Sequence, residues 1–293
     1  LMDSPFKAFI FVDKRFEHGD IVAVGVPAQW HGLMTKPMIS IPFTEAMRVF
    51  GDGPVECRIA VEGRATPGRT SVVTGDLRGR GPGLILAAAH HDSVFNSPAP
   101  DDDLCGVAGG LLLAKKLRGA RGLRSTIRFC AFGAEEVLSE GARWYAFESG
   151  LARDVRFVVQ NDGIGLRAGV TVARATGATM LADWLRRLAR RTPMQLKVVE
   201  EVSPFSDHFP FNCLGAPSVW FTRQSISAWR HYHHTIRDGF AEVSLPRIAE
   251  LMDFQAAMLL SLARSERWPF PRDFSPAMQR EMAMLRREWF SAG

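Results

Sequence analysis

The first 83 residues contain short apolar runs separated by polar, turn-rich stretches. Three of these runs are residues 7–13, 21–27 and 37–50, and the last predicts a strand followed by a short helix. Residues 55–63 alternate between apolar and polar positions, which predicts a half-buried strand. Residues 70–81 predict a second strand that ends in a glycine-rich turn.

From residue 84 onward, predicted strands alternate with predicted helices. The runs 84–89, 125–132, 155–161 and 216–222 predict strands, and the stretches 104–117, 138–149, 180–191, 244–263 and 276–290 predict helices. In the first of these helices the apolar positions expected to face the core are Leu104, Val107, Ala108, Leu111 and Leu112. Such alternation is typical of an α/β fold with a mostly parallel, mixed central sheet and helices on both faces.

Composition places the chain among ordinary globular proteins, since 46% of its 293 residues are hydrophobic and 23% are charged. The net charge of +5 is a mild excess, and no stripe of basic and aromatic residues accompanies it, so nucleic-acid binding is not expected. No apolar run approaches the ~20 residues of a membrane span. The four cysteines form no CxxC pair, so we expect small buried hydrophobic side chains and no disulfide framework.

Acidic and imidazole side chains follow three of the predicted strands. They are His90, His91, Asp92, Glu135, Glu136 and Asp162. Because the carboxyl ends of parallel strands lie at one edge of a sheet, we expect these side chains to converge there. Three aspartates at 101–103 precede the next helix, and a histidine-rich stretch lies at 231–234.

Each of these signals alone has an ordinary explanation. Aspartates before a helix can be capping residues, and paired glutamates or a histidine-rich loop can simply face solvent. Their joint occurrence at the strand ends favours a ligand set of nitrogen and oxygen atoms without thiolates, which suits zinc or a comparable borderline metal. A pair of dications would offset the mutual repulsion of the carboxylates.

Six segments, in order along the chain, resemble the motifs of the M28 zinc peptidases, the aminopeptidase family with co-catalytic zinc. They are AHHDS at 89–93, PDDDLCGVAG at 100–109, AFGAEEVLSEGA at 131–142, QNDGIG at 160–165, SDHFPF at 206–211 and HHTIRD at 233–238. The resemblance covers Arg69 to Leu262 and implies the phosphorylase/hydrolase-like architecture of zinc exopeptidases. Residues 7–50 resemble the closing part of a protease-associated insert found in some members.

The resemblance implies two zinc ions and a role for each matched position. The implied ligands are His90 and Asp162 for one ion, Glu136 and His234 for the other, and Asp102 as the bridge. Glu135 matches the general base, and Asp92 matches the carboxylate that orients the imidazole of His90.

The substrate side of the site is less defined by the resemblance. Asp207 and His208 are expected to support the pocket, and its apolar walls are expected to be Phe205, Phe209, Phe211 and Trp220. Which of Tyr232, His208 and His233 steadies the tetrahedral intermediate stays open.

The implied activity is removal of N-terminal residues from peptides with a free amine, by a metal-activated bridging water with Glu135 as general base. Three alternatives stay open: a glutaminyl cyclase, which shares this fold with a single zinc, a carboxypeptidase of the same family, and a non-catalytic receptor-like domain. Retention of all five ligand positions favours the hydrolase over the cyclase.

The expected organisation is an N-terminal segment at 1–62, part of a protease-associated-like region, then a zinc peptidase domain at 63–264 and a helical tail at 265–293. Because the chain begins with Leu1, we expect a processed or truncated product, and the resemblance favours export to the periplasm or the cell exterior. The sequence predicts no oligomeric state.

Overall fold

A computed structural model of the protein describes residues 3–12, 19–23, 25, 32, 34–64, 66–225 and 232–290. Its centre is a seven-stranded sheet with the order β3-β5-β4-β6-β9-β7-β8. The strands are β3 (Val73–Leu77), β4 (Leu84–His90), β5 (Thr126–Phe132), β6 (Val155–Asn161), β7 (Val170–Thr176), β8 (Leu196–Glu200) and β9 (Ser218–Gln224).

Most neighbours in this sheet are parallel. β5, β4, β6 and β9 run in one direction, β3 is antiparallel to β5 at one edge, and β7 is antiparallel to β9. β8 pairs in parallel with β7 at the other edge. The mostly parallel, mixed sheet predicted from the sequence is confirmed, although β7 and β8 were not among the predicted strands.

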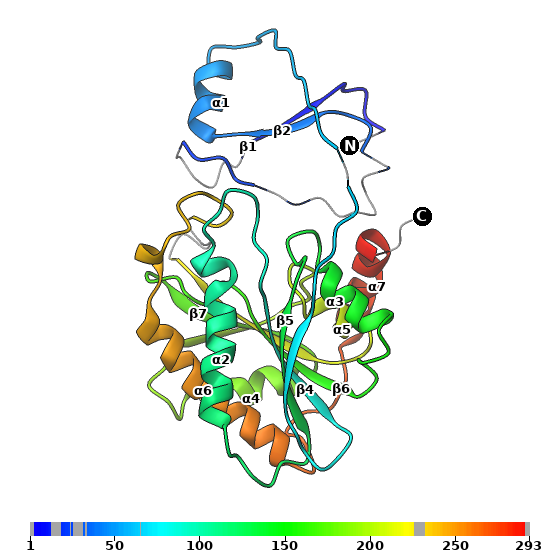
Figure 1. Ribbon diagram of the computed structural model, residues 1–293, viewed down its shortest axis with the longest axis vertical. Helices are drawn as coiled ribbons and strands as arrows, with labels where there is room; N and C mark the ends of the chain where they lie inside the picture. Colours follow the sequence, from blue (N-terminus) through cyan, green and yellow to red (C-terminus); the bar gives the residue numbers. More distant parts are fainter. Residues whose placement is uncertain are drawn as a thin grey trace.

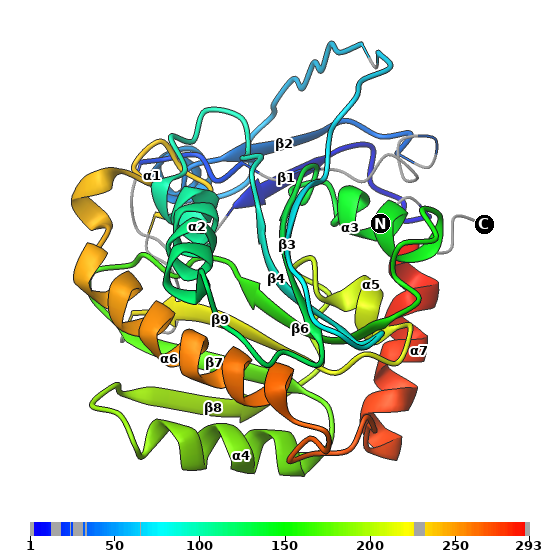
Figure 2. The ribbon, with the colours of Figure 1, turned by 60° about the horizontal axis from the view of Figure 1, so that its bottom comes forward.

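Helices cover both faces of the sheet (Figures 1 and 2). One face carries α2 (Cys105–Leu117), α4 (Thr179–Ala189) and α6 (Leu245–Arg264), and the other carries α3 (Glu140–Phe147), α5 (Phe209–Asn212) and α7 (Pro276–Phe290). In β4, Ile85 and Ala87 belong to the core under the first set, whereas Leu86 and Ala88 belong to the core under α3 and α5. Burial on both sides explains why β4 is a continuous apolar run.

The helix predicted at 104–117 is confirmed as α2, but of its predicted apolar positions only Leu112 packs against the core. Leu104 and Leu111 are 46% and 70% exposed. The buried positions of the helix are Cys105, Gly106, Gly109, Leu113 and Leu117. A Cβ at Gly109 would lie 3.2 Å from the side chains of Ile164 and Met252, so the helix turns its small residues inward to approach α6 closely.

The strand predicted at 55–63 is not formed. The described residues there pair with no other strand, and Val55 and Val61 are about half exposed. Alternation alone does not make a strand, because each backbone amide and carbonyl also needs a partner from a neighbouring strand. Cys57 is consequently an exposed thiol, whereas Cys105 and Cys130 are buried as expected and Cys213 is half-buried, and none of the four forms a disulfide bond within the described residues.

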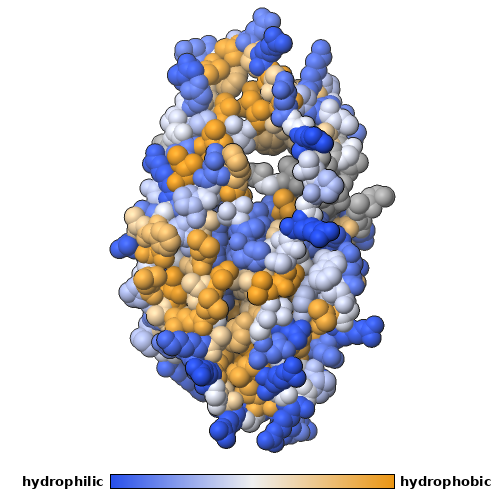
Figure 3. Space-filling model, viewed as in Figure 1, coloured by the Kyte–Doolittle hydropathy of each residue, from blue (hydrophilic) through white to orange (hydrophobic). Residues whose placement is uncertain are grey.

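The N-terminal region is a small unit beside the main sheet. β1 (Phe9–Val12) pairs in parallel with β2 (Met38–Ile41), and α1 (Phe43–Phe50) follows directly, which confirms the strand and helix predicted at 37–50. Part of the apolar run 21–27 lies outside the described residues. The surface is hollowed between this unit and the main body in the view of Figure 3. Of the helices in the described ranges, none is both long and apolar enough to cross a membrane.

Candidate metal centre

The side chains that the sequence analysis assigned to a metal centre converge beyond the carboxyl ends of three adjacent strands. His90 ends β4, Glu135 and Glu136 follow β5, and Asp162 follows β6. Asp102 lies in the π-helical turn η2 (Pro100–Leu104) before α2, and His234 lies in the loop before the 3₁₀ turn η3 (Phe240–Glu242). Side-chain atoms that could bind a metal form three overlapping groups, each within 4.8 Å: Asp102, His233 and His234; His90, Asp102 and Asp162; and His90, Glu135 and Glu136.

Asp102 occupies the middle of this arrangement. Its Oδ1 lies 3.2 Å from Nε2 of His90, and its Oδ2 lies 3.2 Å from Nε2 of His234. The Nε2 atom of His234 is also 3.0 Å from Oε2 of Glu136. The two oxygens of one carboxylate therefore face two different imidazoles, which is the geometry that a carboxylate bridging two ions needs.

The three consecutive aspartates make different contacts. Asp102 faces the histidines, while Oδ1 of Asp101 accepts a hydrogen bond from Gly165 N at 2.7 Å. Asp103 accepts hydrogen bonds from His90 N at 3.2 Å and from Gly106 N at 3.1 Å. Only the bond to Gly106, in the first turn of α2, resembles the helix capping that would explain these residues without a metal.

Two further carboxylates fix the loops that carry the ligands. Asp238 accepts hydrogen bonds from the amides of Asp101 and Asp102, at 3.0 Å each. Asp92 accepts from Glu135 N at 3.0 Å and from Glu136 N at 3.2 Å. It is the Asp92 carbonyl oxygen that lies 3.1 Å from His90 Nδ1, whereas its carboxylate is 3.7 Å away. Asp92 thus contacts the ring mainly through its backbone and holds the glutamates with its side chain.

Asp162 is held by Ser206, to which the sequence assigned no role, and by Trp220, which was expected to be an apolar pocket wall. Ser206 Oγ donates a hydrogen bond to Oδ2 of Asp162 at 2.7 Å, and the indole N–H of Trp220 donates to its carbonyl oxygen at 3.1 Å. Ser206 belongs to the SDHFPF motif, next to Asp207 and His208. Its position in that motif could have indicated that it lies near the site.

The electrostatics of the cluster fit a divalent cation. Burial, together with the charges of Asp162, Asp207 and Glu136, raises the pKa of Glu135 well above its ordinary value. Burial likewise raises the pKa of Glu136, whose Oε1 is buried and has no hydrogen-bond partner among the described residues. For both glutamates burial outweighs the opposing effect of the neighbouring imidazole of His90 or His234, so the protonated form is favoured. A dication would satisfy the Glu136 oxygen and restore the ionised carboxylates, and the nitrogen and oxygen donors present are those that zinc binds.

The sequence of the chain was compared with models of known protein families. The sequence profile described as peptidase family M28 matches residues 72–259, which is more than half of the chain. The chain belongs to peptidase family M28. The match begins before β3 and ends within α6, so it contains every proposed metal ligand.

Two proteins similar to this chain are aminopeptidases from Bacillus subtilis. Aminopeptidase YwaD of Bacillus subtilis (strain 168) is 27% identical over 201 residues, which cover 64% of this chain and 43% of that protein. The crystal structure of BSAP, a zinc aminopeptidase from Bacillus subtilis, matches with a TM-score of 0.59 at 22% identity, over 70% of this chain and 52% of that chain. The M28 chain thus spans about half the length of these relatives.

The same fold also carries another enzyme. A glutaminyl cyclase from Bacteroides thetaiotaomicron, crystallised with N-acetylhistamine, matches with a TM-score of 0.54 at 14% identity, over 67% of this chain and 77% of that chain. The fold alone therefore does not distinguish between hydrolase and cyclase.

Several residues predicted to shape the substrate side of this M28 site are fully buried. Asp207 and His208 are 0% and 1% exposed, and burial lowers the pKa of His208 to about 3, so its imidazole is neutral. Phe209 and Phe211 belong to the hydrophobic cores under α5 and α7, so the prediction that they form pocket walls is wrong. Phe205 is exposed and packs its ring edge-on against Trp289.

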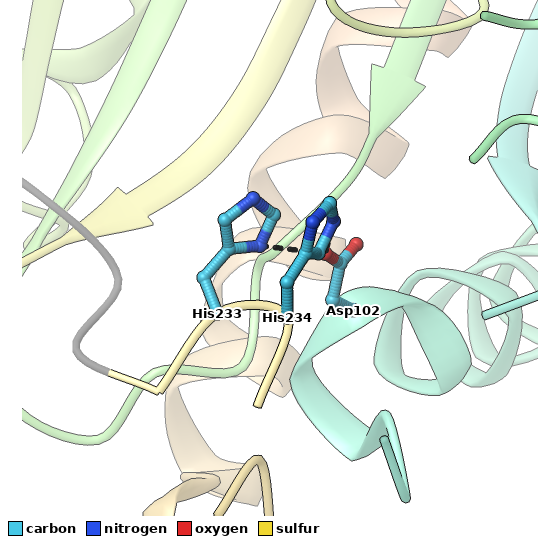
Figure 4. A group of neighbouring side chains, drawn as sticks. All are labelled: Asp102, His233 and His234. Carbon is cyan, nitrogen blue, oxygen red and sulfur yellow. Dashed lines mark ion pairs between the residues drawn. The ribbon is translucent and has the colours of Figure 1, made fainter. Parts of the chain in front are cut away.

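Three residues, His208, Tyr232 and His233, were candidates for stabilising the tetrahedral intermediate, and they lie in different surroundings. The His208 ring packs against Trp220, and the half-buried Tyr232 packs against the Arg237 guanidinium. His233 reaches the metal centre: its Nδ1 lies 2.7 Å from Oδ2 of Asp102, and its ring lies beside that of His234 (Figure 4).

Zinc binding is expected to strengthen as the pH rises. Burial disfavours the imidazolium of His234, but the hydrogen bonds to Asp102 and Glu136 outweigh burial and raise its pKa to about 9. A zinc ion bound by His234, as the resemblance implies, would displace this proton. The apparent affinity for zinc should then rise about tenfold per pH unit for each displaced proton below that pKa and level off above it. Competition titrations at about pH 6, 7 and 8 measure this slope. An affinity independent of pH would contradict proton displacement.

Proposed function

We propose that this chain carries the catalytic centre of a zinc-dependent aminopeptidase that removes N-terminal residues from peptides with a free amine. The observation that supports it most directly is the position of Asp102, whose two oxygens face His90 and His234. A carboxylate with its two oxygens turned to two different imidazoles is suited to be shared between two ions, and a single-ion centre has no use for that arrangement. In this proposal His90 and Asp162 hold one zinc ion, Glu136 and His234 hold the other, and Asp102 is shared.

Glu135 is the proposed general base. Bound zinc would polarise the scissile carbonyl and lower the pKa of the attacking water. Glu135 would accept the proton of that water and deliver it to the departing amine. Its carboxylate lies at the centre, with Oε2 3.9 Å from Nε2 of His90, and its backbone amide is fixed by Asp92. A base held in this way needs no rearrangement before it accepts the proton.

We assign the stabilisation of the tetrahedral intermediate to His233. Its ring reaches Asp102, whereas His208 is enclosed and neutral. An N–H donor beside the developing negative charge would lower the barrier to acyl transfer, and of the three candidates His233 is the one in contact with Asp102. Asp207 and His208, which are buried, would support the wall behind the site rather than touch the peptide.

The decisive experiment combines metal analysis with release of amino-acid anilides. We expect up to two zinc ions per chain, turnover of unblocked anilides, and loss of turnover with a chelator that added zinc reverses. Absence of turnover in protein that holds two ions would contradict the aminopeptidase. Protein that binds no metal would instead support the receptor-like alternative.

Two further substrates separate the remaining alternatives. A peptide that begins with glutamine should release free glutamine, whereas a cyclase would release ammonia and leave the peptide chain uncut. A peptide with a blocked N-terminus and a free C-terminus should be stable, and its shortening would indicate a carboxypeptidase. Both products are distinguished by mass spectrometry of the reaction mixture.

A further inference from the structure

A short N-terminal stretch lies against the outer side of the proposed metal centre. We name residues 20–23 and 25 the N-terminal strap. Ala23 N donates a hydrogen bond to the carbonyl oxygen of His234 at 2.9 Å, and the Nδ1 atom of His234 lies 2.8 Å from the carbonyl oxygen of Ala23. One residue of the strap therefore contacts both the backbone and the ring of a proposed zinc ligand, although the two residues are 211 positions apart.

The contact with the ring determines which nitrogen of His234 faces the centre. A carbonyl oxygen can only accept, so Nδ1 must carry the proton that is shared with Ala23. In the neutral imidazole, Nε2 is then left with its lone pair, and Nε2 is the atom near Glu136 and Asp102. Outer hydrogen bonds of this kind fix the tautomer and the orientation of a ligating imidazole.

The strap also lies directly on the second proposed ligand of the same ion. A Cβ added at Gly25 would stand 1.8 Å from the carbonyl oxygen of Glu136 and 2.8 Å from its carbonyl carbon. No side chain fits in that space, so glycine is required for the approach. Asp20 anchors the start of the strap, since its carboxylate, 7% exposed, lies 2.7 Å from Nε of Arg237 in the His234 loop.

We propose that the strap is a positioning element for the zinc ion held by Glu136 and His234, an inference that rests on the proposed two-zinc function. The other ion does not depend on it in the same way. His90 and Asp162 are held by Asp92, Ser206 and Trp220, all of which belong to the segment that matches the M28 family. The N-terminal region and the peptidase fold thus build one of the two metal sites jointly.

Gly25→Ala in the full chain tests this proposal. We expect the metal-free variant to bind two equivalents of zinc, one with unchanged affinity and one weakened about 10–100-fold, the range typical of losing an outer contact to a metal ligand. Competition titration with a chromogenic chelator resolves the two affinities. Gly63→Ala is the matched control, because a Cβ there meets no atom within 4 Å.

A second variant keeps the test valid if Gly25→Ala does not fold. Asp20→Asn removes the anchoring charge without a steric clash, and we expect a smaller weakening confined to the same equivalent. In either variant, excess zinc should restore full occupancy, which a lost fold would not allow. Two wild-type affinities in both variants, or equal weakening of both equivalents, would overturn the role of the strap. Absence of zinc binding by the wild-type chain would instead contradict the proposed function itself.

Discussion

Replacing Glu135 by glutamine is expected to lower kcat by about 10²–10⁴-fold while both zinc ions remain bound. Glutamine has the shape of glutamate, and the amide of residue 135 can still donate to Asp92, so the loop should keep its position. What the variant loses is the ability to accept a proton. Because Glu135 is not one of the five proposed ligands, the metal sites should be intact, and the loss should fall on kcat rather than on occupancy.

This prediction is checked by steady-state kinetics with an amino-acid anilide and by elemental analysis of the same preparation. Glu148→Gln is a suitable control, since this glutamate is half exposed and pairs with Arg143 on the surface. It should turn over like the wild type. If Glu135→Gln also did so with two ions bound, another group would have to accept the proton.

Sequence patterns predicted the strands β3, β4, β5, β6 and β9 and missed β7 and β8, which lie together at one end of the sheet. The run at β4 is continuous and apolar because helices cover both of its faces, and every residue of that strand is buried. β8 lies at the edge with only half-buried and exposed residues, so its sequence carries little apolar signal. The stretch 55–63 is the opposite case, in which the pattern is present and the partner strand is absent.

The candidate site could be located from the sequence because the fold places strand ends at one edge. His90, Glu136 and Asp162 needed only the order of the strands to be brought together. The exact contacts of Asp92 were not predictable, since its carboxylate and its carbonyl oxygen both lie near the site and only coordinates distinguish their partners. Residue type identified the participants but not which of their atoms are used.

The strap could not be predicted at all. Its contacts to His234 and Glu136 are made by backbone atoms and by the missing side chain of a glycine, which leave almost no trace in residue type. They also join segments more than a hundred residues apart, where local pattern carries no information. Any residue at position 23 would offer the same backbone carbonyl oxygen. Glycine at position 25 is the one residue type that the contact requires, and a glycine in the sequence does not by itself indicate such a contact.

Asp102→Asn is expected to cost the protein at least one of its two zinc ions and, with it, most of its turnover. Asparagine offers one carbonyl oxygen and no charge, so it cannot face both His90 and His234 as the carboxylate does. The remaining four ligands would then have to hold two dications without a shared anion between them. Elemental analysis and competition titration of the variant measure the loss.

The neighbouring residue provides the matched comparison. Asp103→Asn makes the same chemical change one position along the chain, at a carboxylate that accepts hydrogen bonds from the backbone amides of His90, Gly106 and Gly163. We expect it to lower the unfolding temperature and to retain both ions, because asparagine still accepts at one oxygen and no ligand is removed. Full two-ion occupancy in Asp102→Asn would show that this carboxylate does not bridge two ions. Its contacts with two imidazoles would then be explained by packing alone.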